Sequence, residues 1–203
     1  MLAYLAPDEG VLNVWVRTLG KNDDRVITHD RLRGIRSYFW QPDSRHILYE
    51  QDIGGNEDFH LYRTDVETRE TKDLTPFEGV RAQIVAVDPL WPDFMLLGLN
   101  RRNPELFDVY RLAFATGEME MDTENPGDIA GFTADNDLHV RAAEAMLPGG
   151  WQEIRIRADA QSPWRAFQRW GPEDAGGGVA GFSPDNHALW LISKRRCQRR
   201  APP

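Results

Sequence analysis

The sequence predicts an all-β fold made of a repeated four-stranded antiparallel unit. Short runs of β-branched and aromatic residues alternate with turns that contain Gly, Pro, Asp or Asn. The third strand of the unit recurs at spacings of 46, 49 and 45 residues, measured between the aligned positions Val14, His60, Val109 and Ile154. A four-stranded repeat of roughly 40–50 residues is typical of the blade of a β-propeller.

The range 40–75 shows most clearly how one unit is built. The run RHILYEQ is rich in β-forming residues, the glycines of DIGGN supply a tight turn, and EDFHLYRTDV then alternates in polarity. The polar reversal DVETRE leads into the short extended piece TKDLT. With IRSYFW in front, these pieces predict a four-stranded meander.

The other units are expected to follow the same order. The predicted first strands are 35–40, 82–88, 128–133 and 178–183. The predicted second strands are 2–7, 45–51, 93–100 and 137–145. The predicted third strands are 12–19, 58–65, 107–114 and 152–159, and each except that of the first unit is followed by a turn and a short polar strand. Pro with Asp or Asn follows the first strands and favours the tight turns that a meander needs.

The two ends of the chain do not match whole units. The chain starts within a second strand, and the run 187–193 leaves the last unit with two strands. About three complete blades, beginning near Gly34, Gly79 and Asp128, therefore lie between two incomplete ones. The prediction is a partial β-propeller over residues 1–193, either an open arc or a small ring in which the last two strands complete the first blade. A β-sandwich is the alternative, and exposed strand edges in an arc predict self-association.

The last ten residues, 194–203, differ from the rest. The run KRRCQRRAPP is basic and poor in β-forming residues, so we expect a disordered tail. It contains Cys197, the single cysteine of the chain, which excludes an intrachain disulfide and a zinc site made of several thiolates. This cysteine usage is in keeping with a cytoplasmic location.

Composition narrows the classes of partner. The formal net charge is −8, which disfavours binding to nucleic acid or to an anionic membrane surface. No run of about 18 apolar residues is present to cross a membrane. The start MLAYLAPDEG lacks the basic and long apolar segments of a signal peptide.

The sequence offers no pattern typical of a catalytic or metal site. The nearest approach to the G-x-S-x-G motif of a hydrolase nucleophile is GFSPD around Ser183, which has Asp185 in place of the second glycine and fits a turn. The five histidines show no H-x-x-x-H or related ligand spacing. We therefore expect no catalytic residue, no metal and no cofactor in this chain.

Two groups of charged residues are weak candidates for substrate binding at the rim of the propeller. Asp52 and Glu57, together with Asp58, surround the DIGGN turn, and Arg101 and Arg102 follow a predicted second strand. The acids are either a solvated hairpin turn or a loop that faces a substrate; a small enzyme that uses them is a third hypothesis. The arginines are either structural or able to meet a substrate carboxylate.

Longer motifs resemble one known family. The combination of QDIGGNEDFHLY with DLTPFEGVRA is specific, and NVWVRTL, LNRRNPELFDVYRLAFATGE and ENPGDIAGF extend it. Over residues 2–193 the chain resembles the N-terminal β-propeller of prolyl oligopeptidase family serine peptidases, especially the acylaminoacyl-peptidase-like and dipeptidyl-peptidase-like members.

The resemblance implies a function without catalysis. Family members carry a C-terminal α/β-hydrolase domain with a Ser-Asp-His triad, and their propeller covers its active site and admits short peptides. This chain ends before any such domain, so the resemblance implies a truncated, non-catalytic propeller fragment that gates and docks substrate. Its expected partners are a peptide substrate or the missing hydrolase domain. The alternative is a stand-alone propeller-like scaffold for protein interaction. Some members hold a peptide amine with paired glutamates, and no adjacent pair stands here.

Overall fold

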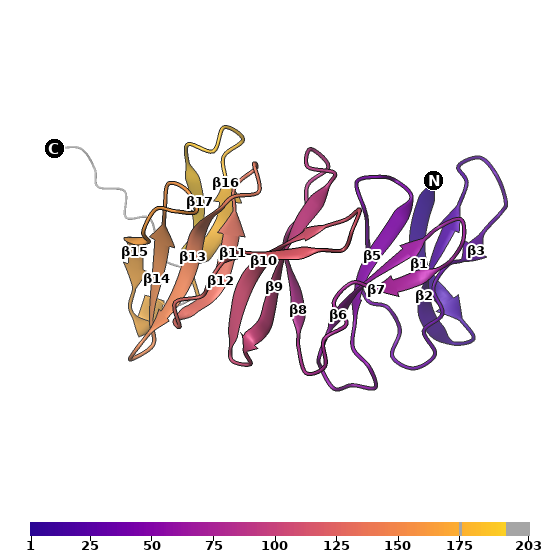
Figure 1. Cartoon of the computed structure of the whole chain (residues 1–203), viewed down its shortest axis with the longest axis horizontal. Coiled ribbons are helices and arrows are strands. Elements are labelled where there is room, and N and C mark those ends of the chain that lie inside the picture. The colour runs from indigo at the N-terminus through magenta and orange to yellow at the C-terminus, as the bar shows by residue number, and fades with distance from the viewer. Residues whose placement is uncertain (175, 194–203) are drawn as a thin grey trace.

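The chain folds into five antiparallel sheets that follow one another along a curved row (Figure 1). The computed structural model describes residues 1–174 and 176–193, so the predicted tail 194–203 lies outside the described residues. In chain order the sheets contain three, four, four, four and two strands. This confirms the predicted partial propeller, with three complete blades between two incomplete ones.

Within each sheet the strands pair in the order of the sequence. The first blade contains β1 (Leu2–Asp8), β2 (Val11–Arg17) and β3 (Arg25–Val26). The second contains β4 (Phe39–Trp40), β5 (His46–Gln51), β6 (His60–Asp65) and β7 (Thr71–Asp73). The third contains β8 (Ala82–Ala86), β9 (Phe94–Asn103), β10 (Leu106–Ala113) and β11 (Met119–Thr123). The fourth contains β12 (Ile129–Ala134), β13 (Val140–Leu147), β14 (Trp151–Ile156) and β15 (Arg165–Trp170). A 3₁₀ turn (Pro172–Asp174) leads to the fifth, β16 (Gly178–Phe182) and β17 (Leu189–Ile192).

The first blade has an outermost strand that the sequence did not indicate. β3 is two residues long, and Val26 pairs with Trp15 of β2. Beyond it the Thr28 hydroxyl, instead of a backbone carbonyl, accepts the Val14 amide at 2.8 Å. A side chain thus completes the ladder where the strand is too short to do so, which explains why no strand-like run is visible in the sequence.

The alignment of the second unit on the others was wrong by one residue. Leu61, not His60, is the equivalent of Val14, because the Leu61 amide donates to the Thr75 hydroxyl at 2.9 Å as Val14 does to Thr28. Leu61 also faces the next blade, as Val14 does. The run EDFHLYRTD alternates in polarity and fits either phase, so only the packing decides.

Apolar side chains between neighbouring sheets form the core. Val14 and Val16 of the first blade pack against Ile35 and Ile47, which lead into or belong to the second. Leu61 of the second blade packs against Leu97 of the third. The inner strands β8, β12 and β16 contact one another in succession, which gives the row its curvature. The molecule is therefore held together face to face, blade against blade.

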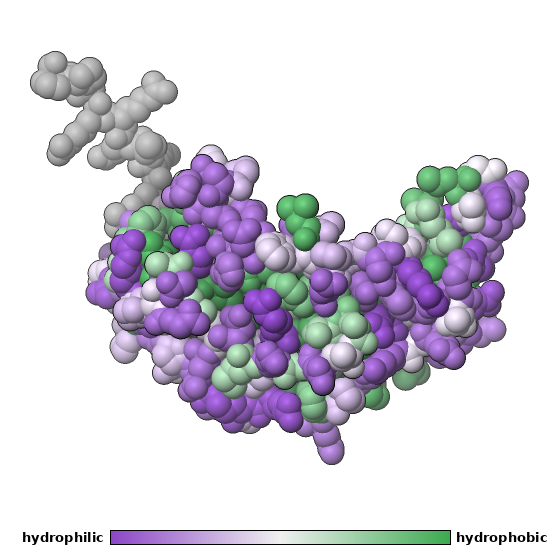
Figure 2. Space-filling model, turned by 45° about the horizontal axis from the view of Figure 1, so that its top comes forward, coloured by the Kyte–Doolittle hydropathy of each residue, from purple (hydrophilic) through white to green (hydrophobic). Residues whose placement is uncertain are grey.

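The last two strands do not complete the first blade. β16 and β17 form their own sheet, which contacts β12 and β13 of the fourth blade. Figure 1 places this sheet and β1–β3 at opposite ends of the row, and Figure 2 shows the curved outline that results. The structure is thus the open arc of the two predicted arrangements. In the described part of the chain no helix is long and apolar enough to cross a membrane.

Packing between blades is expected to dominate stability. Leu97 is fully buried between the second and third blades, so Leu97→Ala should lower the free energy of unfolding by about 2–5 kcal/mol. Leu90→Ala is the matched control, since Leu90 is 79% exposed and its loss should change stability by about 0.5 kcal/mol or less. Urea unfolding measures both, and equal effects would contradict the packing between blades as the source of stability.

Candidate functional site

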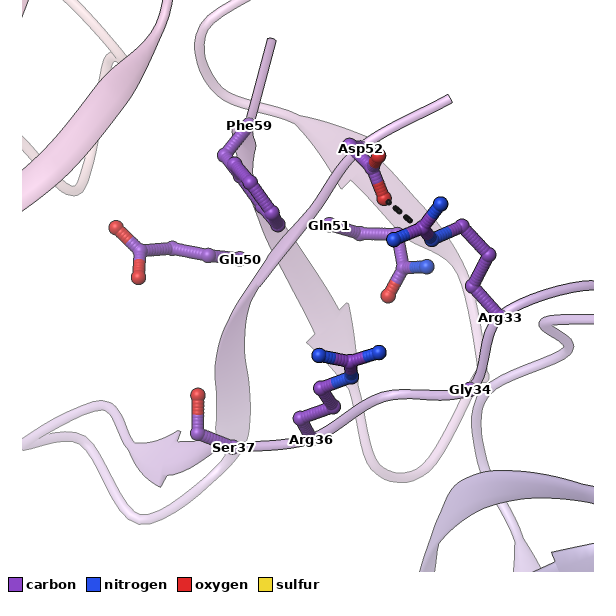
Figure 3. A pocket seen from close by; sticks show the side chains of 8 residues that line it. All are labelled: Arg33, Gly34, Arg36, Ser37, Glu50, Gln51, Asp52 and Phe59. Carbon is purple, nitrogen blue, oxygen red and sulfur yellow. Dashed lines mark ion pairs between the residues drawn. The ribbon is translucent and has the colours of Figure 1, made fainter. Parts of the chain in front are cut away.

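A small pocket lies where the first blade leads into the second (Figure 3). One wall is the segment before β4, which contributes Arg33, Arg36 and Ser37, and the other is the end of β5 with the start of the following hairpin. Its volume is about 190 Å³. Gly34 lies in this wall with φ +78°, and a Cβ there would stand 3.1 Å from the Leu12 Cβ, so a residue without a side chain brings the two blades this close.

Asp52 is the sequence-predicted residue that lies in this pocket. Its carboxylate is buried, with its Oδ1 3.4 Å from Arg33 Nε. Its Oδ2 accepts the Glu57 amide at 3.3 Å, which closes the hairpin between β5 and β6. Figure 3 shows Arg33 and Asp52 pointing toward each other, whereas the Glu50 carboxylate points away from them. Asp52 thus fixes one wall of the pocket to the other.

Glu50 and Arg36 are the charged groups left for a ligand in this pocket. Burial raises the pKa of Glu50 above its usual value, more than the Ile84 backbone hydrogen bond and the charge of Arg81 lower it. Within the described ranges, neither Glu50 nor Arg36 forms an ion pair. The pocket therefore offers a half-buried carboxylate and a guanidinium to a group that enters it.

The other predicted rim residues lie outside the pocket. Glu57 is exposed on the hairpin that follows Asp52. Arg101 stacks on Phe77, with its Cζ 4.2 Å from the ring centroid. Arg102 forms a bidentate ion pair with the buried Asp108 at 3.0 and 2.9 Å. Asp52, Glu50 and Arg36 thus line one pocket, in which the Glu50 carboxylate points away from the Arg33–Asp52 pair. Arg102 is held in a contact within its own blade.

One acid of the DIGGN hairpin, Asp58, borders a second hollow of about 540 Å³. Asp58 and Glu78 line it, together with a pair in which His60 Nδ1 and Asp73 Oδ2 are 2.7 Å apart. His60 stacks on Tyr62. The histidine is held by its partners between two strands, as a structural residue would be.

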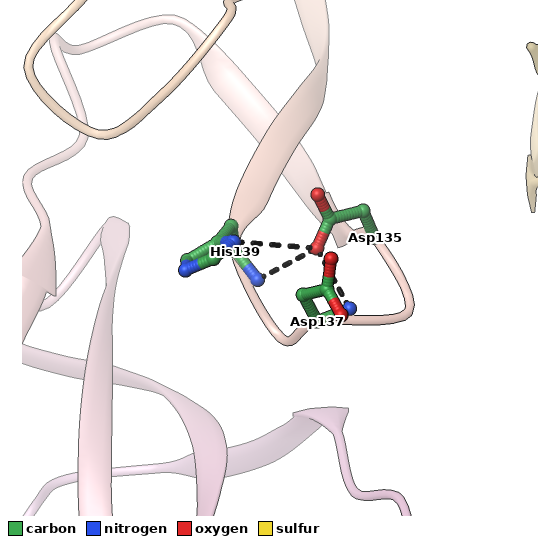
Figure 4. Close-up of side chains that lie close together, drawn as sticks. All are labelled: Asp135, Asp137 and His139. Atoms are coloured by element: carbon green, nitrogen blue, oxygen red, sulfur yellow. Dashed lines mark hydrogen bonds and ion pairs between the residues drawn. The ribbon is translucent and has the colours of Figure 1, made fainter. Parts of the chain in front are cut away.

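Asp135, Asp137 and His139 bring three possible metal-ligand atoms within 4.8 Å of one another (Figure 4). They lie in the turn between β12 and β13, and their alternate spacing in DNDLH is the signal that a search for H-x-x-x-H misses. Asp135 accepts two backbone amides of this turn and bonds to Arg141 at 3.1 Å. The buried carboxylate is therefore already compensated, and the cluster reads as a turn.

Ser183 lies in the turn between β16 and β17, as the sequence predicts. Its hydroxyl donates to Asp185 at 2.6 Å and accepts the Ala188 amide at 2.8 Å. The pocket residues Arg36, Ser37 and Glu50 were not predicted. Their sequence signal is slight: charged and polar residues at the ends of two neighbouring strands.

The pKa of Glu50 predicts a pH effect on stability. A raised pKa in the folded state means that stability is full below the ordinary value near 4.5 and falls as the pH rises through the folded value. Glu50→Gln removes this fall, so the variant should gain stability relative to the parent between about pH 4 and about pH 7. Melting temperatures at both pH values measure the difference.

Glu153→Gln is the control of opposite sign. Hydrogen bonds from Arg155 and Arg169 hold the pKa of Glu153 below its usual range. The stabilisation by Glu153 is present at pH values above the ordinary pKa of a glutamate. It is lost as the pH falls through the lower pKa that Glu153 has in the folded state. This variant should therefore lose more stability at about pH 7 than at about pH 3. The same sign of change in both variants would refute the assignment.

Two curated relatives show to which family the chain belongs. No family model matches the chain. The chain is 40% identical over 169 residues to dipeptidyl aminopeptidase BIII from Pseudoxanthomonas mexicana, and the match covers 82% of this chain and 24% of that protein. It is 31% identical over 157 residues to dipeptidyl peptidase family member 6 from Caenorhabditis elegans, with 73% of this chain and 21% of that protein covered.

A solved structure agrees in fold. Prolyl oligopeptidase B from Galerina marginata matches with a TM-score of 0.62 at 12% identity, over 93% of this chain and 28% of that chain. The chain thus spans about a quarter of the length of the curated relatives that it matches. By its sequence identity to dipeptidyl peptidases and its blade architecture, the chain is a β-propeller segment of the prolyl oligopeptidase family.

Proposed function

We propose that the chain is a non-catalytic propeller segment of a peptidase, whose role is to dock and gate short peptides. The observation that carries the proposal is the pocket at the junction of the first two blades, where Glu50 and Arg36 have no ion-pair partner among the described residues. Identity to dipeptidyl peptidases supports peptides as the class of ligand.

The chemistry of the pocket suits the end of a peptide. A terminal amine is a cation that a half-buried carboxylate such as Glu50 binds through a charge-assisted hydrogen bond. The Arg36 guanidinium then faces the carbonyl oxygens of the first residues. The volume of about 190 Å³ is below the roughly 300–1,000 Å³ typical of pockets that bury a whole small ligand. The pocket therefore selects a chain end over an internal segment.

A stand-alone interaction scaffold is the second candidate. In the described part of the chain, β1 pairs only with β2, and β17 pairs only with β16, so each leaves one strand edge unpaired. Such an edge accepts an extended segment of a partner by strand addition, or a second copy of the chain. A downstream reading frame with G-x-S-x-G and later Asp and His would favour the peptidase, and its absence would favour the scaffold. A cytoplasmic location belongs to this proposal and rests on cysteine usage alone.

Docking predicts that a free peptide amine is required. Trialanine should bind the chain, and acetylation of its amine or Glu50→Gln should each weaken binding by roughly tenfold, the loss expected for one charge-assisted contact. Titration calorimetry measures the affinities. Glu105→Gln, an exposed acid at the hairpin of the third blade, is the matched control and should bind like the parent. Equal binding of the free and the acetylated peptide would contradict the role of Glu50.

Absence of catalysis is a separate expectation. The purified chain should cleave no peptidyl substrate, because Ser183, the serine nearest to a nucleophile motif, is engaged with Asp185 and Ala188 in a turn. A fluorogenic peptide assay checks this. Cleavage that a serine-directed inhibitor abolishes would overturn the non-catalytic assignment.

A further inference from the structure

Three cations gather on the outer flank between the second and third blades. Arg63 of β6 and Lys72 of β7 are directly opposite each other in the strand pairing. Arg101, near the end of β9, lies over the ring of Phe77. Like charges directly opposite each other on neighbouring strands destabilise a sheet. The pair therefore costs stability unless an anion lies close by.

Arg63 and Lys72 both face the third blade. Leu61 on β6 and Leu74, the residue directly after β7, stand two residues away from Arg63 and Lys72. The Leu74 amide donates to the Leu61 carbonyl at 2.8 Å, so the pairing continues through Leu74 and both leucines lie on the same face as the cations. Both leucines pack between the second and third blades, against Leu97 among others. The two cations thus lie at the outer margin of this packed face.

No carboxylate of the described chain neutralises these cations. Arg63, Lys72 and Arg101 form no ion pair within residues 1–174 and 176–193. Arg63 donates instead to the Phe114 carbonyl at 2.7 Å. The Lys72 ammonium lies beside Gly117, 3.6 Å from where a Cβ would stand. Two cations, Lys72 and Arg101, are left for an outside ligand.

Lys72 and Arg101 line one hollow of about 310 Å³ on this flank. Leu74, Phe77 and Met119 supply an apolar floor. Asp73 is the one acid among the residues that line it, and both of its oxygens are taken: Oδ1 accepts the Thr75 amide at 2.8 Å, and Oδ2 is 2.7 Å from His60 Nδ1. The hollow thus combines two unpaired cations with apolar walls, and it lies between two complete blades.

We propose that this hollow binds a small organic anion, a carboxylate or a phosphate ester, that carries an apolar body. The anion sits between the Lys72 ammonium and the Arg101 guanidinium, while its apolar part covers Leu74, Phe77 and Met119. The ammonium acts as a point charge, and the planar guanidinium donates two parallel hydrogen bonds. The chain as a whole has a net charge of −8 and repels anions. The hollow is a local cationic site, so an anion is attracted only when it is close to this flank.

The test is a titration followed by the backbone amide NMR signals of the full chain. N-acetylleucine should shift the signals of Lys72, Phe77 and Gly117, and the neutral N-acetylleucine amide should not. Phenyl phosphate distinguishes the two sources of anion: tighter binding than N-acetylleucine identifies a phosphate ester, and weaker binding a carboxylate. Binding of the amide as tight as that of the acid, or absence of shifts at this flank with both anions, would overturn the proposal.

Variants separate this site from general charge effects. Lys72→Gln and Arg101→Gln should each lower the affinity by roughly tenfold. Arg165→Gln is the matched control, an exposed arginine of the fourth blade without an ion pair in the described chain, and should leave the affinity unchanged. Glu50→Gln should also leave it unchanged, so the outcome does not depend on peptide docking.

A further variant tests the repulsion between Arg63 and Lys72 in the absence of a ligand. Lys72→Glu places a carboxylate opposite Arg63, so it should abolish binding and raise the melting temperature. A lower melting temperature together with unchanged binding would show that Lys72 has a structural role alone.

Discussion

The arc depends on one buried polar side chain near the start of each of the strands β2, β6, β10 and β14. In the first three of these blades the side chain bonds to a residue in or just after the outermost strand of its own blade. In the fourth blade it bonds to Arg169 of the outermost strand β15. Each of these polar residues is followed by an aliphatic residue that faces the next blade. The four residues are at most 9% exposed: Asn13, His60, Asp108 and Glu153. Because a buried polar group without a partner is costly, each outer segment must adopt the conformation that satisfies it, and the next aliphatic residue then points at the neighbouring blade.

The shape of the candidate pocket depends on Asn13, the first of these four buried polar residues. Asn13 Oδ1 accepts the Asp30 amide at 2.8 Å, and the Asp30 carboxylate in turn accepts the amides of Arg33 and Gly34. The segment that carries Arg33 and Arg36 is therefore held from its backbone. The Arg33–Asp52 pair then ties it to the end of β5. Because this backbone is fixed before a ligand binds, the cost of ordering on binding is confined to side chains such as that of Arg36.

The strands could be predicted from the sequence because their signals are local. Alternation and turn residues place three complete blades, and the QDIGGNEDFHLY motif points to the correct family. What the sequence could not supply depends on contacts between distant segments. The alternating run allows either Leu61 or His60 to be aligned with Val14, and only the packing between blades decides. The pairing beyond β3 is completed by the Thr28 hydroxyl, which leaves no strand-like run in the sequence. Asp52 was predicted from its hairpin, but Glu50 and Arg36 become neighbours only when two blades pack.

Stability in this architecture is a sum over neighbouring blades, as in other repeat proteins, because each sheet buries its faces only against the next. The two outer faces of the arc gain nothing of this kind: Leu2 at one end is 48% exposed, and Trp190 and Ile192 at the other are each 61% exposed. The interface between the second and third blades is internal and rich in leucine, yet its outer margin carries the opposed cations Arg63 and Lys72. This interface can bear such a repulsion because its apolar interior outweighs it. An anion that binds only the folded chain at this margin therefore adds to the stability of the interface, by an amount that grows with the anion's concentration and affinity.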